Sequence, residues 1–309
     1  MKNFRRFALF TTAATYFVIF VGGLVRVSGA GLGCPDWPRC FGRWIPPTSV
    51  EQLPPDIDPA QFNFVLAWIE YINRLIGMTV GLFIAATALW ALFGYRRHRK
   101  IVIPAVIAAL LTAVQGWQGS VVIASQLEPL VVTVHTLLAL IIVSLLLYVT
   151  QETYYVERKS SFKASTWPRS VTVSLGILWL VAIVQIVFGT QIRSSLEVIS
   201  AEFPLLSSAE WILKVGALNH VHMTLGLLLA AYSWVVAFSI WKYRTRFTPL
   251  MKQSLAAMVV VIAGQLVLGI LFMVVKLTPL LQVFHLWLAA LYVGLTLILY
   301  LQSKREVVT

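Results

Sequence analysis

Residues 101–150 read IVIPAVIAALLTAVQGWQGSVVIASQLEPLVVTVHTLLALIIVSLLLYVT, and this stretch decides the fold. Two apolar runs, 101–123 and 131–150, are separated by a short polar segment that ends in Pro129. Each run is long enough to cross a bilayer as a helix, which takes about 20 apolar residues. Because backbone groups in lipid must be bonded within their own segment, the stretch predicts two transmembrane helices joined by a short turn.

The rest of the chain repeats this pattern. Of its 309 residues, 59% are hydrophobic and 12% are charged, and the mean hydropathy is +0.83, values unlike those of a soluble domain. Further apolar runs lie at 7–27, 64–93, 171–192, 212–240, 253–274 and 281–302. The sequence predicts an all-α polytopic membrane protein with eight spanning helices, the first of which is the N-terminal run rather than a cleaved signal. A soluble nucleotide-binding or hydrolase fold is excluded.

Basic residues are distributed unevenly between the two ends of these helices. The chain carries 24 Lys and Arg against 12 Asp and Glu, a formal charge of +12. With the N-terminus in the cytoplasm, 17 of the 24 basic residues fall on the cytoplasmic side, as the positive-inside rule expects. We therefore expect a multi-pass plasma-membrane protein with both termini in the cytoplasm. Membrane insertion explains the charge, and no nucleic-acid partner is expected.

The sequence also contains an internal duplication. Without a gap, Gln115 recurs 150 positions later as Gln265, Gly119 as Gly269, Pro129 as Pro279 and His135 as His285, while Arg26 corresponds to Arg193 at a shift of 167 and Asn73 to His222 at a shift of 149. We expect two duplicated four-helix bundles, residues 1–151 and 170–309, joined by a polar cytoplasmic linker at 152–169. Because each half has four spans, the repeats are parallel and related by an axis along the membrane normal.

Histidines inside the predicted spans are functional candidates, because ionisable residues are costly there. His135, His222 and His285 all lie one or two turns from the outer surface. His222 and His285 share a depth in the C-terminal half, and two facing imidazoles suit the axial ligation of a haem iron. The alternative is that each histidine satisfies a hydrogen bond within its bundle. Zinc is less favoured, because no carboxylate or cysteine lies at that depth.

Glu70 is the other informative residue inside a span. Glu70, Asn73 and Arg74 are spaced i, i+3 and i+4, so they share one face of a helix. One interpretation is a structural ion pair between Glu70 and Arg74, and the other is a general acid/base or charge stabiliser at Glu70 beside a bound substrate. Arg26 and Arg193 lie at outer helix ends, where they suit either haem propionates or anchoring at the interface.

The longest predicted connection, residues 29–61, is rich in Pro and Gly and carries both cysteines, Cys34 and Cys40. On the expected topology it faces an oxidising compartment. Three interpretations stay open, namely a structural disulfide, a redox-active thiol pair and a metal site. The metal site is the weakest, because no third or fourth soft ligand lies nearby.

The chain resembles the haem A synthase family, of the bacterial type with one cysteine pair in the first outer loop, over its whole length. The resemblance rests on eight helices in duplicated halves, the segment GGLVRVSGAGLGCPDWPRC at 22–40, the E-x-x-x-R motif at 70–74 and the histidines near the starts of three later helices. It implies oxidation of the C8 methyl group of haem O to a formyl group in haem A biosynthesis. The sites that it implies are His222 and His285 for haem b, the N-terminal half with His135 for the substrate haem, Glu70 as the essential carboxylate, and the pair Cys34 and Cys40.

One position departs from the family pattern. The family usually has E-x-x-H-R, whereas here Asn73 stands in the place of the histidine, so the N-terminal half offers only His135 as a ligand. A five-coordinate or weakly six-coordinate iron still suits a site that binds a substrate and releases a product. The departure argues against a simple two-haem electron carrier, which needs a strong axial pair in each half.

Two other functions remain as alternatives to the enzyme. The first is a b-type haem membrane protein for electron transfer or redox sensing without porphyrin chemistry, and the second is a transporter of haem or another small molecule. Glu70 favours the enzyme, because an electron carrier has no need of an acid there. Candidate partners besides haem O and the lipid bilayer are haem O synthase, cytochrome oxidase assembly factors and a second copy of the chain.

Overall fold

The computed structural model describes residues 2–158, 162–164, 167–275 and 277–307. Within these residues, eight helices are long and apolar enough to cross a membrane, which confirms the predicted number. They are α1 (Lys2–Val27), α2 (Phe64–Gly94), α3 (Arg99–Ala124), α4 (Pro129–Glu157), α5 (Arg169–Glu202), α7 (Ala217–Trp241), α8 (Pro249–Val274) and α9 (Pro279–Gln302). The chain is a multi-pass membrane protein.

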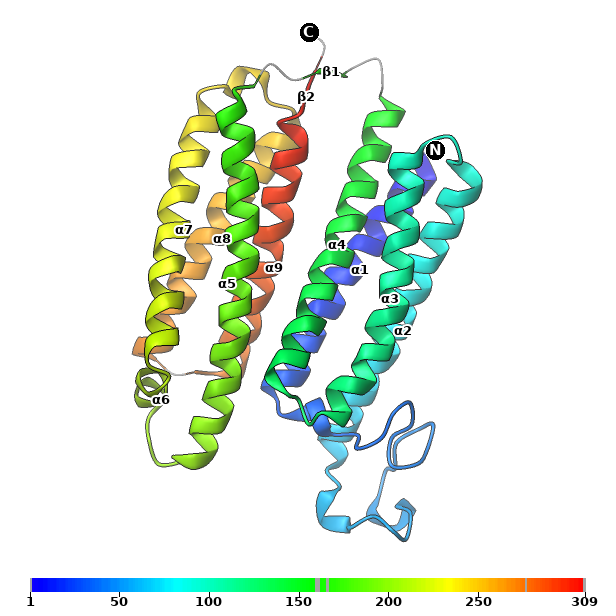
Figure 1. The fold of residues 1–309 in the computed structure, drawn as a ribbon. Coiled ribbons are helices and arrows are strands. Elements are labelled where there is room, and N and C mark those ends of the chain that lie inside the picture. The colour runs from blue at the N-terminus through cyan, green and yellow to red at the C-terminus, as the bar shows by residue number, and fades with distance from the viewer. Residues whose placement is uncertain (1, 159–161, 165–166, 276, 308–309) are drawn as a thin grey trace.

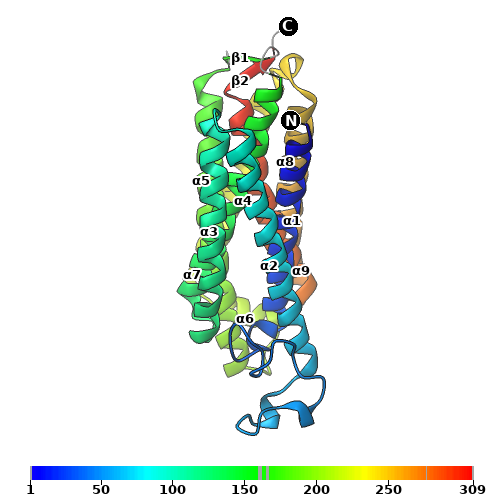
Figure 2. The ribbon, with the colours of Figure 1, turned by 90° about the vertical axis from the view of Figure 1, so that its right-hand side faces the viewer.

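The spanning helices form two neighbouring groups (Figures 1 and 2). Helices α1 to α4 pack together in the first group, and α5, α7, α8 and α9 pack together in the second. The groups meet where α1 and α4 contact α9 and where α4 contacts α5. Both termini lie at one end of the helices, here called the termini end, and the connection 28–63 lies at the opposite end, here called the loop end.

Hydrogen bonds from side chains fasten the two groups to each other. The Thr133 hydroxyl of α4 bonds the Thr190 hydroxyl of α5 at 2.8 Å, and the Gln191 amide donates to Thr133 Oγ1, also at 2.8 Å. The Trp287 indole N–H of α9 donates to the Tyr16 carbonyl of α1 at 3.0 Å. Without a hydrophobic driving force between helices in lipid, such bonds help to set which helix faces meet.

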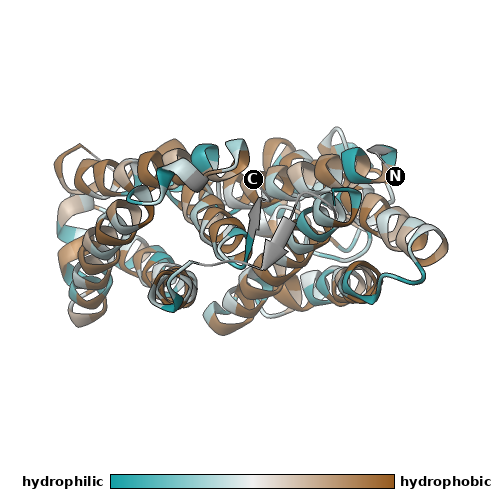
Figure 3. Ribbon diagram, turned by 90° about the horizontal axis from the view of Figure 1, so that it is seen from above, coloured by the Kyte–Doolittle hydropathy of each residue, from teal (hydrophilic) through white to brown (hydrophobic). Residues whose placement is uncertain are grey.

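The outer surface of the helices suits contact with lipid. Seen from the termini end, most of the helical ribbon is hydrophobic (Figure 3). Large apolar side chains point outward on both groups, and Leu82 is 63% exposed, Phe93 73% and Val260 69%. Patches of this kind on several helices are rare on soluble monomers and normal for a protein surrounded by acyl chains.

The sixth predicted span, 212–240, is wrong as a single helix. The structure has a short helix α6 (Ser208–Lys214), a break at Gly216 with φ 71°, and then α7. A capping box explains the extra helix, because the Ser207 hydroxyl accepts from the Glu210 N–H while the Glu210 carboxylate accepts from the Ser207 N–H. The preceding helix α5 also continues to Glu202, ten residues beyond the predicted end, because the prediction followed only the apolar run and the helix extends past it.

A small antiparallel pair of strands accompanies the helices. Strand β1 (Phe162–Ala164) pairs with β2 (Arg305–Val307) at the termini end (Figure 1). Next to it, the Arg305 guanidinium donates to both carboxylate oxygens of Glu152, at 2.9 and 3.0 Å. The pair thus ties the segment between the two groups to the segment that follows α9. Part of the predicted linker 152–169 lies outside the described residues.

Candidate functional site

The carboxylate of Glu70 is buried in α2 near the loop end. Its side chain is 6% exposed and is paired with Arg74, whose Nη2 lies 2.9 Å and whose Nε lies 3.2 Å from Glu70 Oε1. The second oxygen, Oε2, is buried and has no hydrogen-bond partner among the described residues. The ion pair expected from the i, i+4 spacing is therefore present, and the second carboxylate oxygen is enclosed by the protein near the Gly33 backbone.

Arg74 also holds the connection that carries the cysteines. Its Nη1 donates to the Asp36 and Arg39 carbonyls at 2.9 and 2.8 Å, and its Nη2 reaches the Cys34 carbonyl at 3.3 Å. One guanidinium thus binds Glu70 and three loop carbonyls at once. Sequence reasoning missed this contact, because the partners lie 35 to 40 residues away in the chain and no periodic pattern relates them.

Cys34 and Cys40 form a disulfide, with a Cα–Cα distance of 4.7 Å, and both residues are buried. This pairing agrees with the first of the three interpretations above. The Asp36 carboxylate shapes the enclosed loop by accepting from the backbone N–H groups of Phe41 (2.6 Å) and Gly42 (2.9 Å).

Gly33 explains how closely this loop approaches α2. A Cβ at that position would overlap the Leu66 carbonyl of α2, so only glycine permits the approach. The disulfide loop is therefore seated directly over the turn of α2 that holds Glu70 and Arg74.

The histidine of the first group, His135, is held by two glutamines of α3. Its Nδ1 lies 2.6 Å from Gln118 Oε1, and the Gln115 amide donates to the His135 carbonyl at 3.1 Å. Because Gln118 Oε1 accepts, Nδ1 carries the proton and Nε2 is left as the nitrogen with a free lone pair. This is the arrangement that a second-sphere partner gives a metal-binding imidazole. Asn73 lies one turn from Glu70 on α2, at the repeat position of His222.

In the second group, His222 of α7 and His285 of α9 face each other. Their ring centroids are 6.4 Å apart with an angle of 60° between the rings. Both Nδ1 atoms are buried without a hydrogen-bond partner among the described residues. Two imidazoles bound to opposite sides of one metal, each through a bond of about 2 Å, have ring centroids roughly 6 Å apart. The separation therefore fits one iron between the rings, as a bis-histidine haem requires.

Glutamines again fix the backbone next to these rings. Gln185 Nε2 donates to the His222 carbonyl at 2.8 Å, and Gln265 Nε2 donates to the His285 carbonyl at 2.6 Å. The bond from Gln265 repeats the bond from Gln115 in the first group. His220, two residues from His222, is exposed. The described residues contain no cluster of three or more His, Cys, Asp or Glu side chains arranged to hold a metal ion.

Arg26 and Arg193 meet at the loop end, between α1 and α5. Arg193 Nη2 lies 3.1 Å and Arg26 Nε 3.6 Å from the same oxygen of Glu197, and Arg26 Nη2 donates to Ser194 Oγ at 2.8 Å. The Nε atoms of both arginines are buried and lack a hydrogen-bond partner in the described part of the chain. Two guanidiniums with one carboxylate leave one positive charge, which suits a bound carboxylate. The sequence related the two arginines by the repeat but did not indicate Glu197.

Comparison with known proteins adds independent information to this geometry. The model of the cytochrome oxidase assembly protein family (COX15-CtaA) matches residues 5–297. Heme A synthase from Shewanella oneidensis is 35% identical over 145 residues, 44% of this chain and 42% of that protein. Heme A synthase from Exiguobacterium sibiricum is 32% identical over 146 residues, 47% of this chain and 44% of that protein.

A third relative aligns over more of the chain. Heme A synthase from Bacillus licheniformis is 23% identical over 254 residues, 77% of this chain and 75% of that protein. The matches to the first two relatives, in contrast, span less than half of their length. The family model, in contrast, matches nearly the whole of this chain. The chain therefore belongs to the cytochrome oxidase assembly protein family.

Proposed function

We propose that this protein is a haem A synthase, which oxidises the C8 methyl group of haem O to a formyl group. The observation that carries the proposal is the buried Glu70 carboxylate, whose Oε2 has no hydrogen-bond partner among the described residues. It lies in the helix group that offers a single histidine as a ligand, His135. An electron-carrying cytochrome has no use for such an acid and needs two ligands there. The printed name of the relatives supports the same activity.

Each of the two helix groups holds one haem site. We assign haem b to His222 and His285, whose facing rings and ring separation suit it. When bound, haem b supplies one-electron transfer. Gln185 and Gln265 hold the backbone carbonyls of the two ligands and so keep both rings in register across the group.

The substrate haem occupies the first group, in residues 1–151. There His135 would bind the iron of haem O through Nε2, because Gln118 holds its Nδ1, and Asn73 stands where a second histidine would lie. A weak sixth position favours exchange of substrate and product. The repeated bonds from Gln115 and Gln265 support the division into duplicated halves 1–151 and 170–309, joined by the linker 152–169.

Glu70 acts at the methyl carbon. Oxidation of a methyl group to a formyl group takes up one water molecule and releases four protons and four electrons, and the electrons pass to an external acceptor. The Glu70 carboxylate can stabilise the positive charge that builds next to the ring or accept one of the protons. Arg74 orients the carboxylate by donating to Oε1. Arg26 and Arg193, with one positive charge in excess over Glu197, bind haem propionates at the loop end.

The positive-inside pattern supports a plasma-membrane location with the termini end in the cytoplasm and the loop end outside. The disulfide of Cys34 and Cys40 suits the oxidising side of that membrane. A haem O synthase supplies the substrate, and cytochrome oxidase assembly factors receive the product.

Coexpression with a haem O synthase tests the proposal. Cells that make haem O but lack haem A should accumulate haem A when this protein is present, as measured by chromatography of extracted haems. If haem O persists unchanged while the purified protein holds a low-spin haem b, the protein is a b-type cytochrome and the proposal is refuted.

A further inference from the structure

Gln118 of α3 contacts the ring of His135, the histidine that the first helix group offers as a ligand. The side chain of Gln118 is buried, its Oε1 lies 2.6 Å from His135 Nδ1, and its Nε2 donates to the Val131 carbonyl at 2.9 Å. Because the amide nitrogen is bonded to a carbonyl, the amide oxygen is the atom that faces the ring, and Nδ1 is the donor. The amide therefore keeps a proton on Nδ1 and leaves Nε2 free to bind a metal.

The second helix group has no counterpart of this contact. Gln115 and Gln265, which are 150 positions apart, each donate to the backbone carbonyl of the histidine that follows them by 20 residues. The same shift places Leu268 at the position of Gln118. A leucine side chain has no acceptor, and His285 Nδ1 is buried without a hydrogen-bond partner among the described residues. The glutamine that holds the backbone is thus present in both halves, and the glutamine that holds the ring is present only in the first.

The other ligand position of the first group differs from its repeat in two residues at once. In the second group, Gln185 Nε2 donates to the His222 carbonyl at 2.8 Å. At the repeat shifts of 167 and 149, Val18 and Asn73 stand in the places of these two residues. The ligand and the glutamine that supports it are therefore both replaced, which leaves His135 as the one strong ligand of this group.

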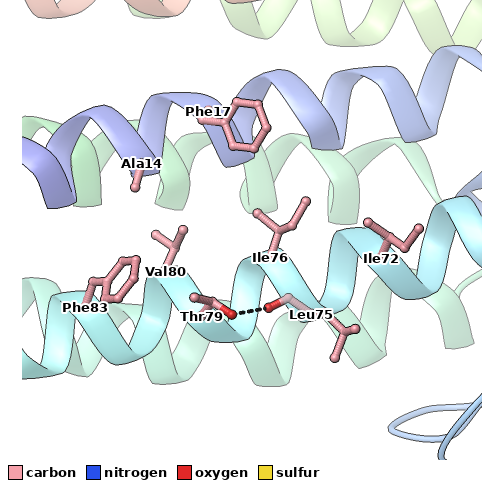
Figure 4. Close-up of a pocket in the computed structure, with 8 residues that line it drawn as sticks. All are labelled: Ala14, Phe17, Ile72, Leu75, Ile76, Thr79, Val80 and Phe83. Carbon is pink, nitrogen blue, oxygen red and sulfur yellow. Dashed lines mark hydrogen bonds between the residues drawn. The ribbon is translucent and has the colours of Figure 1, made fainter.

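The outward face of α2 supplies no substitute ligand. Figure 4 shows the groove between α1 and α2 on that face, and among the described residues that line it there is no His, Cys or Met, the usual axial ligands of haem iron. Thr79 lies nine residues after Glu70, half a turn out of phase, and its hydroxyl donates to the Leu75 carbonyl at 2.8 Å. An iron in the first group therefore depends on the bond from His135.

A hydrogen bond donated by Nδ1 makes an imidazole a stronger ligand. The acceptor draws on the N–H proton and so raises the basicity of the other ring nitrogen, which binds the metal. A more basic axial ligand stabilises ferric iron more than ferrous iron and lowers the reduction potential, since hydrogen bonding around the ligands is one of the ways a protein sets that potential. A lower potential suits a site from which electrons have to leave.

We propose that Gln118 is a positioning residue for the reaction: acting through His135, it strengthens the one strong axial bond to haem O and lowers the potential of that iron. This inference rests on the proposed function, because it places haem O beside His135. It also gives a reason for Leu268, since a haem with two strong ligands does not need a reinforced one.

Replacing the amide tests the proposal. Gln118→Leu copies the residue of the second group, and Gln118→Glu keeps an acceptor for Nδ1 in either protonation state. The matched control is Gln115→Leu, which removes a bond to the backbone of the same histidine and leaves the ring contact in place. The full-length proteins, purified with their haem b, are loaded with haem O and reduced under argon. Resonance Raman spectroscopy then reads the iron–histidine stretching band of the high-spin haem, to which a low-spin bis-histidine haem does not contribute.

Gln118→Leu should lower the frequency of this band and weaken the binding of haem O by about 10- to 100-fold, the scale for losing a partner of a ligating histidine. Gln118→Glu should restore both, and Gln115→Leu should keep the wild-type frequency. In Gln118→Leu the potential of the high-spin haem should rise, by about 59 mV for each tenfold by which the affinity for ferric haem falls more than that for ferrous haem.

The proposal is overturned if the loaded wild type shows no such band, if Gln118→Leu keeps the wild-type frequency, or if Gln115→Leu shifts it equally. If Gln118→Leu loses its haem b and so has not folded, Leu268→Gln decides: it should lower the potential of haem b, and an unchanged or higher potential overturns the proposal. Because these measurements read the iron–histidine bond, their failure differs from a failure of the proposed function, which appears as an absence of haem A in cells with the wild type.

Discussion

Replacing Glu70 and Arg74 one at a time separates a catalytic carboxylate from a structural one. The side chains are 6% and 15% exposed, so the ion pair is largely buried. In Glu70→Gln, the amide oxygen still accepts from Arg74, and Arg74 keeps its three loop carbonyls. The loss is then the difference between a charged and a neutral hydrogen bond, about 1 to 2 kcal/mol of stability.

Arg74→Gln removes much more from the structure. It leaves the Glu70 carboxylate buried without its partner, which costs about 3 to 5 kcal/mol when a buried pair is broken from one side. It also leaves the carbonyls of Cys34, Asp36 and Arg39 without their shared donor. We expect Arg74→Gln to loosen the disulfide loop and to lower thermal stability well below that of Glu70→Gln.

The loss of activity in Glu70→Gln should be large although its loss of stability is small. Glu70→Gln should fold, keep haem b, and form haem A roughly 10²-fold more slowly, the scale for losing a positioned acid or base. The assay is haem A per molecule of folded protein in cells supplied with haem O, alongside thermal unfolding in detergent. Glu128→Gln, at an exposed cap of α4, is the matched control. Near wild-type haem A from Glu70→Gln would show that the pair is only structural.

Two further predictions concern the other site residues. His222→Ala and His285→Ala should each abolish the low-spin b-type spectrum, whereas His220→Ala should retain it; a full spectrum in both ligand variants contradicts the assignment of haem b. Cys34 and Cys40 should resist thiol labelling in protein isolated anaerobically and react only after reduction, as read by mass spectrometry; full labelling without reductant would mean that the disulfide is not stable in the native protein.

Much of the fold follows from one-dimensional patterns. Apolar runs located all eight spans, because burial in lipid requires length and hydropathy that are visible in the sequence. The break at Gly216 was not visible, because the apolar pattern continues across it and only the capping box of Ser207 and Glu210 signals a new helix. The last ten residues of α5 were missed because they lie beyond the apolar run that the prediction followed.

The candidate site was less accessible to sequence reasoning. The facing of His222 and His285 was predictable, since equal depth on two helices of one bundle brings side chains together. The convergence of Arg26 and Arg193 on Glu197 was not, because Glu197 has no counterpart in the repeat. Contacts between a loop and a distant helix depend on the three-dimensional path of the loop, which periodicity does not describe.

The pairing of β1 with β2 has a consequence for biogenesis. Strand β2 follows all eight spanning helices, so the ribosome makes it only after every one of them has been synthesised. The pairing of β1 with β2 and the bond of Arg305 to Glu152 therefore form late, after the first helix group has had time to insert and pack. A chain truncated after Gln302 should hold both groups in the membrane with their termini ends unfastened, and a protease that cuts near residue 158 should distinguish it from the full-length chain.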